Sequence, residues 1–203
     1  MYDCSMQFPS STVFLMSKKR VFVGITGASG AIYGVRLIKA LKKAGHEIHL
    51  VISRWGEETL TYETSESKAS LKDEVYKIYE EDDLAAGPAS GSFHLDAVVI
   101  VPCSMKTLAG IAHGYADNLI ARAADCALKE HRKLIVVPRE SPLNLIHIRN
   151  MEKVAEAGAI VIPASPAFWH KPKTIDELVD SIVDRILSHL NSARDSAAVW
   201  TGE

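Results

Sequence analysis

Residues 21–30 read VFVGITGASG, and this stretch decides the fold. Val21–Ile25 is a short apolar run, which predicts a strand, and a glycine-rich turn follows it. Apolar residues then recur at helical spacing from Ile32 to Leu41, and Gly45 marks the end of that helix. A strand, a glycine loop and a helix in this order form the repeating unit of a doubly wound parallel sheet.

The same alternation of strand and helix continues along the chain. Further strands are predicted at Glu47–Ile52, Leu134–Val137 and Ala159–Ile162. Ala97–Val101 is predicted to be a central strand that ends at Pro102. One further helix is predicted to begin near Trp55, and another to cover Asn118–Arg132 with Asp117 as its N-cap. Two more are predicted, one from about Ile146 to Gly158 and one that begins after Thr174. Residues 63–91 are the least regular part, with either a short helix or an edge strand at Asp73–Tyr79.

These patterns predict a single α/β domain with a doubly wound, mostly parallel sheet and helices on both faces, in a Rossmann-like or flavodoxin-like arrangement. Its expected bounds are 18–191, between a loose N-terminal extension at 1–17 and a C-terminal tail at 192–203. Arg185 lies at the margin of the apolar face of the last helix, so an interface or ligand role is one interpretation. That face is expected to pack on the sheet through Ile175, Leu178, Val179, Ile182, Val183, Ile186, Leu187 and Leu190.

The composition excludes several classes of function. Of the 203 residues, 47% are hydrophobic and 24% charged, and the formal net charge of −2 argues against a surface that binds nucleic acid. The apolar runs are far shorter than the roughly 18 residues of a membrane span. The three cysteines and eight histidines show no spacing typical of a disulfide framework or a metal site. We therefore expect a cytoplasmic protein without a metal.

Polar residues gather directly after the predicted strands, where the carboxyl ends of parallel strands form a ligand site. Hydroxyls and an arginine there favour a phosphate-bearing ligand. Three alternatives stay open: the glycine loop is only a tight turn, Ser104–Thr107 is an ordinary N-cap, and Cys103 is a buried residue and not a nucleophile. The residues concerned are Thr26 to Ser29, Ser53, Cys103 to Thr107, Arg139, Glu140, and Ala164 to Phe168.

Five stretches, taken in order, resemble the UbiX/Pad-type flavin prenyltransferases. They are GITGASGA at 24–31, PCSMKTL at 102–108, RAAD at 122–125, LKE at 128–130 and PRESPL at 138–143, and the match runs from about Lys19 to Leu190. The resemblance implies assembly as a dodecamer and transfer of a dimethylallyl group from dimethylallyl monophosphate to N5 and C6 of reduced FMN. The prenylated FMN would serve a partner decarboxylase of the UbiD type.

The same resemblance implies roles for individual residues. Ser29 would lie near flavin N5, and the residues that bind FMN would be Gly27, Ala28, Ser29, Ser53, Ser104, Met105, Lys106, Thr107 and Arg139. The prenyl phosphate would be surrounded, partly from neighbouring subunits, by Ser90, Gly91, Arg122, Lys129, Trp169 and Arg185. Glu63 and Glu140 would handle protons, and Ser29 and Lys129 would complete the catalytic set. Either Glu140 or the released phosphate would accept the proton lost at flavin C6.

Two positions depart from the family pattern. Trp169 stands where the family usually has tyrosine, so an indole N–H replaces a phenol that both donates and accepts. Leu84 stands near a place where some members have tryptophan. A non-catalytic flavin carrier, or an accessory subunit of a phenolic-acid decarboxylase, therefore stays open. A flavin-dependent cysteine decarboxylase is a second alternative, although the essential histidine and the Asn- and Met-rich loop of those enzymes are not found in this sequence.

Overall fold

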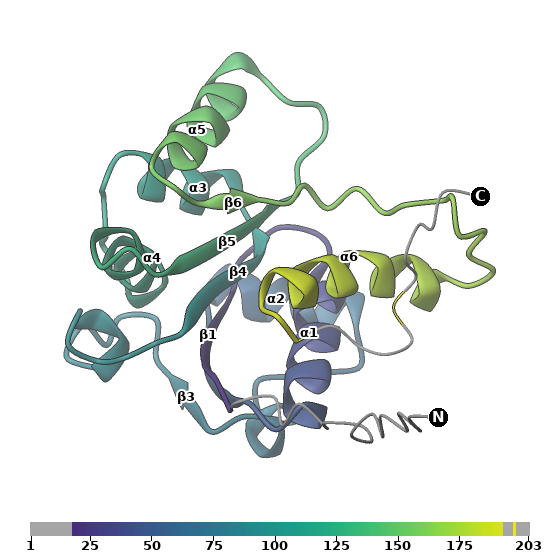
Figure 1. Cartoon of the computed structure of the whole chain (residues 1–203), viewed down its shortest axis with the longest axis horizontal. Coiled ribbons are helices and arrows are strands. Elements are labelled where there is room, and N and C mark those ends of the chain that lie inside the picture. The colour runs from purple at the N-terminus through teal and green to yellow at the C-terminus, as the bar shows by residue number, and fades with distance from the viewer. Residues whose placement is uncertain (1–17, 193–196, 198–203) are drawn as a thin grey trace, which may run out of the picture.

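The computed structural model describes residues 18–192 and 197. In this part of the chain, strands and helices alternate along the sequence (Figure 1). The strands are β1 Arg20–Ile25, β2 Glu47–Ile52, β3 Lys77–Tyr79, β4 Ala97–Cys103, β5 Lys133–Pro138 and β6 Ile160–Val161. The helices are α1 Ala31–Lys43, α2 Arg54–Glu63, α3 Met105–Ala112, α4 Leu119–Lys129, α5 Leu145–Glu156 and α6 Ile175–His189, with the 3₁₀ turns η1 Lys72–Glu74 and η2 Gly87–Ala89.

The strands pair in parallel in one sheet, in the order β3-β2-β1-β4-β5-β6. The chain begins at β1 in the middle, winds outward to β3, and then crosses to β4 on the other side of β1. Val21 of β1 is thus aligned with both Ile48 of β2 and Ala97 of β4. This order confirms the predicted doubly wound sheet. It puts the topological switch point, where such folds bind ligands, between β1 and β4.

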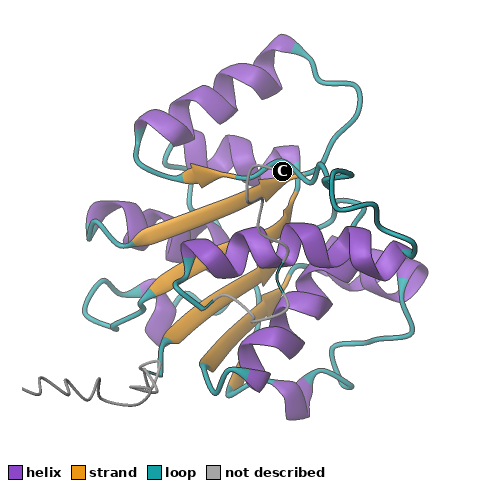
Figure 2. Ribbon diagram, turned by 45° about the vertical axis from the view of Figure 1, so that its right-hand side comes forward, coloured by secondary structure: helices purple, strands orange, loops and turns teal. Residues whose placement is uncertain are grey.

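Two hydrophobic layers cover the sheet, because side chains alternate between its faces along each strand. Val21, Val23 and Ile25 pack with α1, α2 and α6, whereas Phe22 packs with α3, α4 and α5 on the other face. Figure 2 shows the helices on both sides of the strands. The expected packing of the last helix is confirmed for most of its apolar face, which lies against α1 and the sheet.

The predicted end of β4 and both predicted ends of α4 were wrong, and the predicted bounds of β5 and β6 each differ by one residue at either end. β4 continues through Pro102 to Cys103, and its register with β5 is irregular there because proline has no N–H for the ladder. Asn118, not Asp117, is the N-cap of α4, since its side-chain oxygen accepts a hydrogen bond from Ala121 N–H at 2.9 Å. The helix ends at Lys129, earlier than predicted.

The irregular segment contains both of the predicted alternatives, the short 3₁₀ turn η1 and the edge strand β3. Ile175 was wrongly assigned to the buried face of α6: it is 78% exposed, because it is the first residue of the helix and precedes the turns that reach the core.

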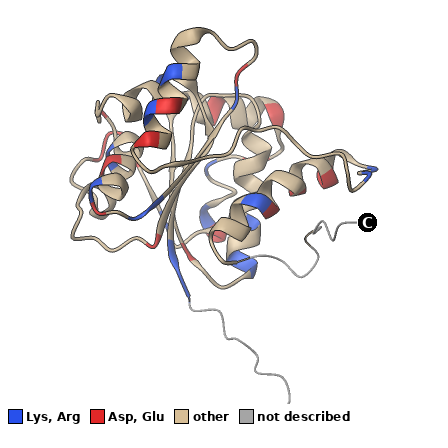
Figure 3. Ribbon diagram, turned by 45° about the horizontal axis from the view of Figure 1, so that its top comes forward, with Lys and Arg blue, Asp and Glu red and all other residues tan. Residues whose placement is uncertain are grey.

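No helix in the described ranges is long and apolar enough to cross a membrane. Figure 3 shows basic and acidic residues interspersed over the helices. The predicted extension at 1–17 and most of the predicted tail at 192–203 lie outside the described residues, so these domain bounds stay predictions.

Candidate functional site

The candidate site lies at the carboxyl edge of the sheet, at the switch point. The chain leaves β1 for α1 on one face and leaves β4 for α3 on the other. Thr26 joins the two exits: its buried hydroxyl oxygen accepts from Ser104 N–H at 2.8 Å, and its O–H donates to the Pro102 carbonyl at 2.8 Å. The two loops are therefore held together as one unit.

Close packing shapes the glycine loop. A Cβ on Gly27 would lie 2.4 Å from the Cβ of Trp55 at the start of α2, so only glycine fits there. Gly30, the N-cap of α1, has a φ of 104°, a left-handed conformation that favours glycine. Ala28 is buried, whereas Gly27 and Ser29 are exposed. The loop thus turns sharply and presents Ser29 outward.

Two serines cap the helices that begin beside this loop. Ser53 accepts from Gly56 N–H at 3.0 Å at the start of α2, and Ser104 accepts from Thr107 N–H at 3.4 Å at the start of α3. Ser104 and the α3 N-terminus are therefore an N-cap, as the plainer interpretation expected. The remaining N–H groups and the positive ends of the helix dipoles still make this edge of the sheet favourable for an anion.

Glu63 occupies the N-terminus of α1. One of its carboxylate oxygens accepts from Gly30 N–H at 2.7 Å and from Ala31 N–H at 2.9 Å. Glu63 is the last residue of α2, so this contact connects α2 to α1 directly beside Ser29. A carboxylate is electrostatically favourable at this end of a helix. The residue predicted to handle protons is thus also a helix cap.

Arg139 and Glu140 follow β5 and are exposed. Arg139 N–H donates to the Cys103 carbonyl at 3.3 Å, which brings this segment next to the end of β4. Burial raises the pKa of Tyr33 on α1, and the Arg139 guanidinium opposes that increase. Burial raises the pKa of the Cys103 thiol to about 12, which favours a buried structural residue over a nucleophile.

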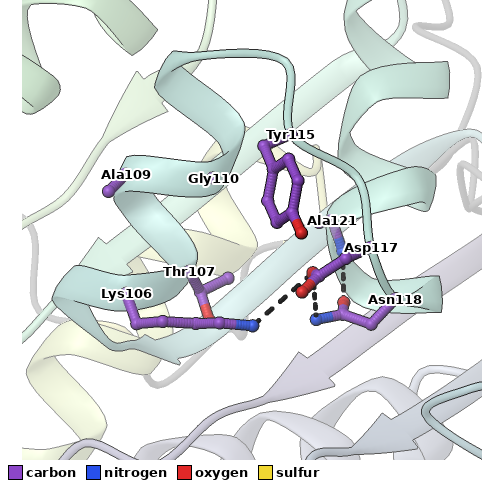
Figure 4. Close-up of a pocket in the computed structure, with 8 residues that line it drawn as sticks. All are labelled: Lys106, Thr107, Ala109, Gly110, Tyr115, Asp117, Asn118 and Ala121. Carbon is purple, nitrogen blue, oxygen red and sulfur yellow. Dashed lines mark hydrogen bonds and ion pairs between the residues drawn. The ribbon is translucent and has the colours of Figure 1, made fainter.

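A cavity of about 360 Å³ lies between α3 and α4. Lys106 reaches across it toward Asp117, with 3.5 Å between Nζ and Oδ1, and the ring of Tyr115 borders it (Figure 4). Two of the residues predicted to bind flavin, Lys106 and Thr107, therefore line a cavity. The complete lining is Lys106, Thr107, Ala109, Gly110, Tyr115, Asp117, Asn118 and Ala121.

Four of the residues predicted to surround the prenyl phosphate come together along α4. The Arg122 Nε donates to the Ala89 carbonyl at 3.0 Å. Gly91 lies two residues after Ala89, and a Cβ on it would lie 2.5 Å from the Lys129 Nζ. Ser90 lies between these contacts. The loop after η2 is thus packed against the cations of α4. We name these two loop residues and two cations the α4 group: Ser90, Gly91, Arg122 and Lys129.

Within one chain, Lys129 lies apart from Trp169, Arg185 and the loop after β1. Lys129 lies near the start of β5, whereas Thr26 and Ser104 lie at strand ends, and a six-residue strand spans about 20 Å. Arg185 is on α6, which covers the opposite face of the sheet from α4. Trp169 lies half-exposed in the segment between β6 and α6, which reaches away from the sheet in Figure 1.

Sequence reasoning left out two residues that organise the site. Thr26 was treated only as part of the loop, although a hydroxyl directly after a buried strand was a usable signal. Arg132 was named only as the end of the predicted helix Asn118–Arg132, but its guanidinium donates to the carbonyls of Gly91 at 2.7 Å and Phe93 at 2.8 Å. No local pattern shows a contact of this kind, because its partners are 41 and 39 positions away.

Comparison with known proteins places these features among flavoproteins. A family model described as Flavoprotein matches residues 10–187. A probable UbiX-like flavin prenyltransferase of Streptomyces sp. (strain D7) is 48% identical over 184 residues, which cover 90% of this chain and 92% of that relative.

Solved structures give the same result. AnUbiX (PadA1), in complex with FMN and dimethylallyl pyrophosphate, matches with a TM-score of 0.90 and 42% identity, covering 92% of this chain and 99% of that one. A dodecameric FMN-dependent UbiX-like decarboxylase from Escherichia coli O157:H7 matches with a TM-score of 0.88 and 43% identity, covering 90% and 100%. The likeness thus includes the sequence as well as the fold.

Proposed function

Because this chain belongs to the flavoprotein family and, within it, to the UbiX-like flavin prenyltransferases, we propose that it joins a dimethylallyl group from dimethylallyl monophosphate to N5 and C6 of reduced FMN. The product, prenylated FMN, is supplied to a UbiD-type decarboxylase. The working enzyme is a cytoplasmic homo-oligomer, for which the dodecameric relative is the guide.

The observation that carries this function is the unit at the switch point. Thr26 holds the glycine loop after β1 against the start of α3. The loop that would contact the flavin ring and the helix start that would hold the rest of FMN are therefore fixed relative to each other. This is the place where a doubly wound sheet binds a nucleotide.

The residues at this edge fit FMN. Gly27 lets the loop lie directly against Trp55, because a Cβ there would lie 2.4 Å from the Trp55 Cβ, and α2 and α3 direct N–H groups toward an anion. The ring would contact Gly27, Ala28 and Ser29. When bound, reduced FMN supplies the nucleophilic atoms that accept the prenyl group. Ser29 would orient the ring edge at N5, because its hydroxyl both donates and accepts. The rest of FMN would be held by Ser53, Ser104, Met105, Lys106, Thr107 and Arg139.

The α4 group would bind the prenyl phosphate. Breaking the allylic C–O bond leaves the electron pair on a phosphate oxygen, and Arg122 and Lys129 would stabilise that growing negative charge. Trp169 would provide an aromatic wall that tolerates positive charge on the allyl group, and Arg185 a further cation. Since these residues lie on different faces and edges of one chain, the complete site would combine residues of neighbouring subunits.

Two carboxylates would handle protons. Glu140, exposed after β5, would accept the proton that leaves flavin C6 when the new ring closes, a task that the released phosphate would otherwise perform. Glu63 lies beside Ser29 and would serve the N5 side of the ring. Among residues 18–192 and 197, no group of three His, Cys, Asp or Glu side chains could hold a metal ion, and no step assigned to these residues uses one.

The two alternatives, a flavin carrier and a cysteine decarboxylase, are not favoured, because a relative at 47% identity, from Lactiplantibacillus plantarum, is named a flavin prenyltransferase. The proposal is tested by reconstitution. Protein, reduced FMN and dimethylallyl monophosphate are incubated without oxygen, and the filtrate is added to an apo-decarboxylase of the UbiD type. Decarboxylation that requires both protein and prenyl phosphate supports the proposal. Glu140→Gln should bind FMN but supply no activity, and failure of the wild-type filtrate would contradict the function.

A further inference from the structure

An ion pair lies on the surface of the α4 group. Lys129 is the last residue of α4 and Glu130 is its C-cap. The Lys129 Nζ lies 2.5 Å from the Glu130 Oε1, and both side chains are partly exposed. The ammonium that would bind the substrate phosphate therefore already has an anionic partner in its own chain.

The pair is packed directly against the phosphate loop, residues 89–93. A Cβ on Gly91 would lie 2.3 Å from the Glu130 Oε1 and 2.5 Å from the Lys129 Nζ. The carboxylate thus fills the space between the loop and the lysine. Any side chain at position 91 would displace one of the two groups.

Arg132 prevents this loop from moving away from the pair. Its two terminal nitrogens donate to the carbonyls of Gly91 and Phe93 at 2.7 and 2.8 Å. The hydrogen bond and charge of Lys129 lower the pKa of Glu130, so this side chain is an anion at neutral pH. A phosphate that approaches Lys129 along the loop meets a fixed negative charge.

We propose that Glu130 competes with the phosphate group of the substrate for Lys129, and so sets how tightly phosphate is held before and after the reaction. This inference rests on the proposed function. A phosphate dianion carries more charge than a carboxylate and displaces it on entry. After transfer, inorganic phosphate departs with the electron pair of the broken C–O bond, and Glu130 pairs with Lys129 again. The competition therefore favours release of the product phosphate.

The test compares wild-type protein with Glu130→Gln, which keeps the size of the side chain and removes its charge. Inorganic phosphate is titrated into the full-length, FMN-loaded oligomer by calorimetry. The strength of exposed ion pairs implies that the dissociation constant for phosphate falls about two- to fivefold in this variant. The KM for dimethylallyl monophosphate should fall by a similar factor, and phosphate should become a stronger product inhibitor. The affinity for FMN should not change.

Glu156→Gln, at the exposed end of α5, is the matched control and should bind phosphate like the wild type. Glu130→Asp, which shortens the reach of the carboxylate, should give an intermediate phosphate affinity. Equal or weaker phosphate binding by Glu130→Gln would overturn the inference, because Glu130 would then assist Lys129. Failure of the proposed function is a separate result: phosphate binding would still depend on Glu130, but the wild type would not prenylate FMN.

Discussion

The backbone N–H of Ser104 donates a hydrogen bond of 2.8 Å to the side-chain oxygen of Thr26. These residues follow β4 and β1, 78 positions apart, and their contact spans the switch point of the sheet. The same hydroxyl donates to the Pro102 carbonyl, which also accepts from the backbone N–H of Thr26 at 3.2 Å. The shape of the proposed flavin site depends on this one side chain.

Replacing Thr26 with valine should therefore weaken both the fold and the flavin site. The variant keeps the shape of the side chain but removes the acceptor of the Ser104 N–H and one of the two hydrogen bonds to the Pro102 carbonyl, which costs about 1–3 kcal/mol of unfolding free energy. Urea denaturation measures this loss, and fluorescence titration should show weaker FMN binding. Thr61→Val, which removes an exposed hydroxyl bonded within α2, is the control and should change neither quantity. Unchanged stability of Thr26→Val would refute the bridging role.

Glu63→Ala should destabilise the protein by about 1 kcal/mol, because it removes a carboxylate that caps two N–H groups at the start of α1. Glu63→Gln keeps an acceptor oxygen and should lose less. Exposed Glu58 on the same helix provides the control, with Glu58→Ala within about 0.5 kcal/mol of the wild type. If Glu63→Gln is nearly as stable as the wild type but inactive, the proton role is supported separately from the cap; a fully stable Glu63→Ala would exclude the cap.

Stability should decrease below about pH 6.5, partly through His46. Burial, and then the charge of Lys19, lower the pKa of His46 in the folded state, and its Nδ1 accepts from Lys19 N–H at 3.2 Å. The unfolded chain therefore binds more protons. The contribution of neutral His46 to stability is complete above the pKa of the unfolded state and is lost as the pH falls through the lower pKa of the folded state. His49 and His189, whose pKa values burial also lowers, act in the same direction.

His46→Asn should reduce this pH dependence, because an amide oxygen accepts near Lys19 but does not titrate. Urea unfolding at pH 8 and pH 5.5 measures the difference for each protein. An equal loss of stability in wild type and variant would show that His46 does not contribute.

Arg132→Lys should raise the KM for dimethylallyl monophosphate by about tenfold, the effect of losing one charge-assisted hydrogen bond. A lysine ammonium is a point charge and does not hold the carbonyls of Gly91 and Phe93 in a fixed fork. Since Arg132 acts through the loop, kcat and the affinity for FMN should stay unchanged. Arg36→Lys disturbs a similar paired contact, to Asp180, far from the α4 group and should leave this KM unaltered. A fall in kcat with constant KM would contradict a positioning role.

The sequence predicted the sheet well because its central strands are continuous apolar runs. Glu47–Ile52 coincides with β2, and the predicted Val21–Ile25 lies within one residue of β1. The ends of β4 and α4 were less accurate, since a proline inside a strand and the choice between Asp117 and Asn118 as a cap depend on neighbouring segments. Patterns of hydrophobicity determine which segments are buried, but not where each hydrogen-bond ladder stops.

For the site, the positions after each strand could be predicted because parallel strands end at one edge. The α4 group was reached only through resemblance to a family, since nothing local links Gly91 to Lys129. The capping role of Glu63 and the loop contact of Arg132 could not be predicted, because they are tertiary contacts between residues 32 or more positions apart. How neighbouring subunits complete the site depends on how copies of this chain are arranged, which the sequence of one chain does not show.

The central claim is that this protein alkylates reduced FMN, and the mass of the flavin tests it most directly. The protein is incubated without oxygen with reduced FMN and dimethylallyl monophosphate, and the flavin is released and measured by mass spectrometry. We predict that the flavin gains one five-carbon prenyl unit and that inorganic phosphate appears in equal amount. Flavin of unchanged mass, recovered from protein that still binds FMN, would contradict the account and indicate a flavin carrier.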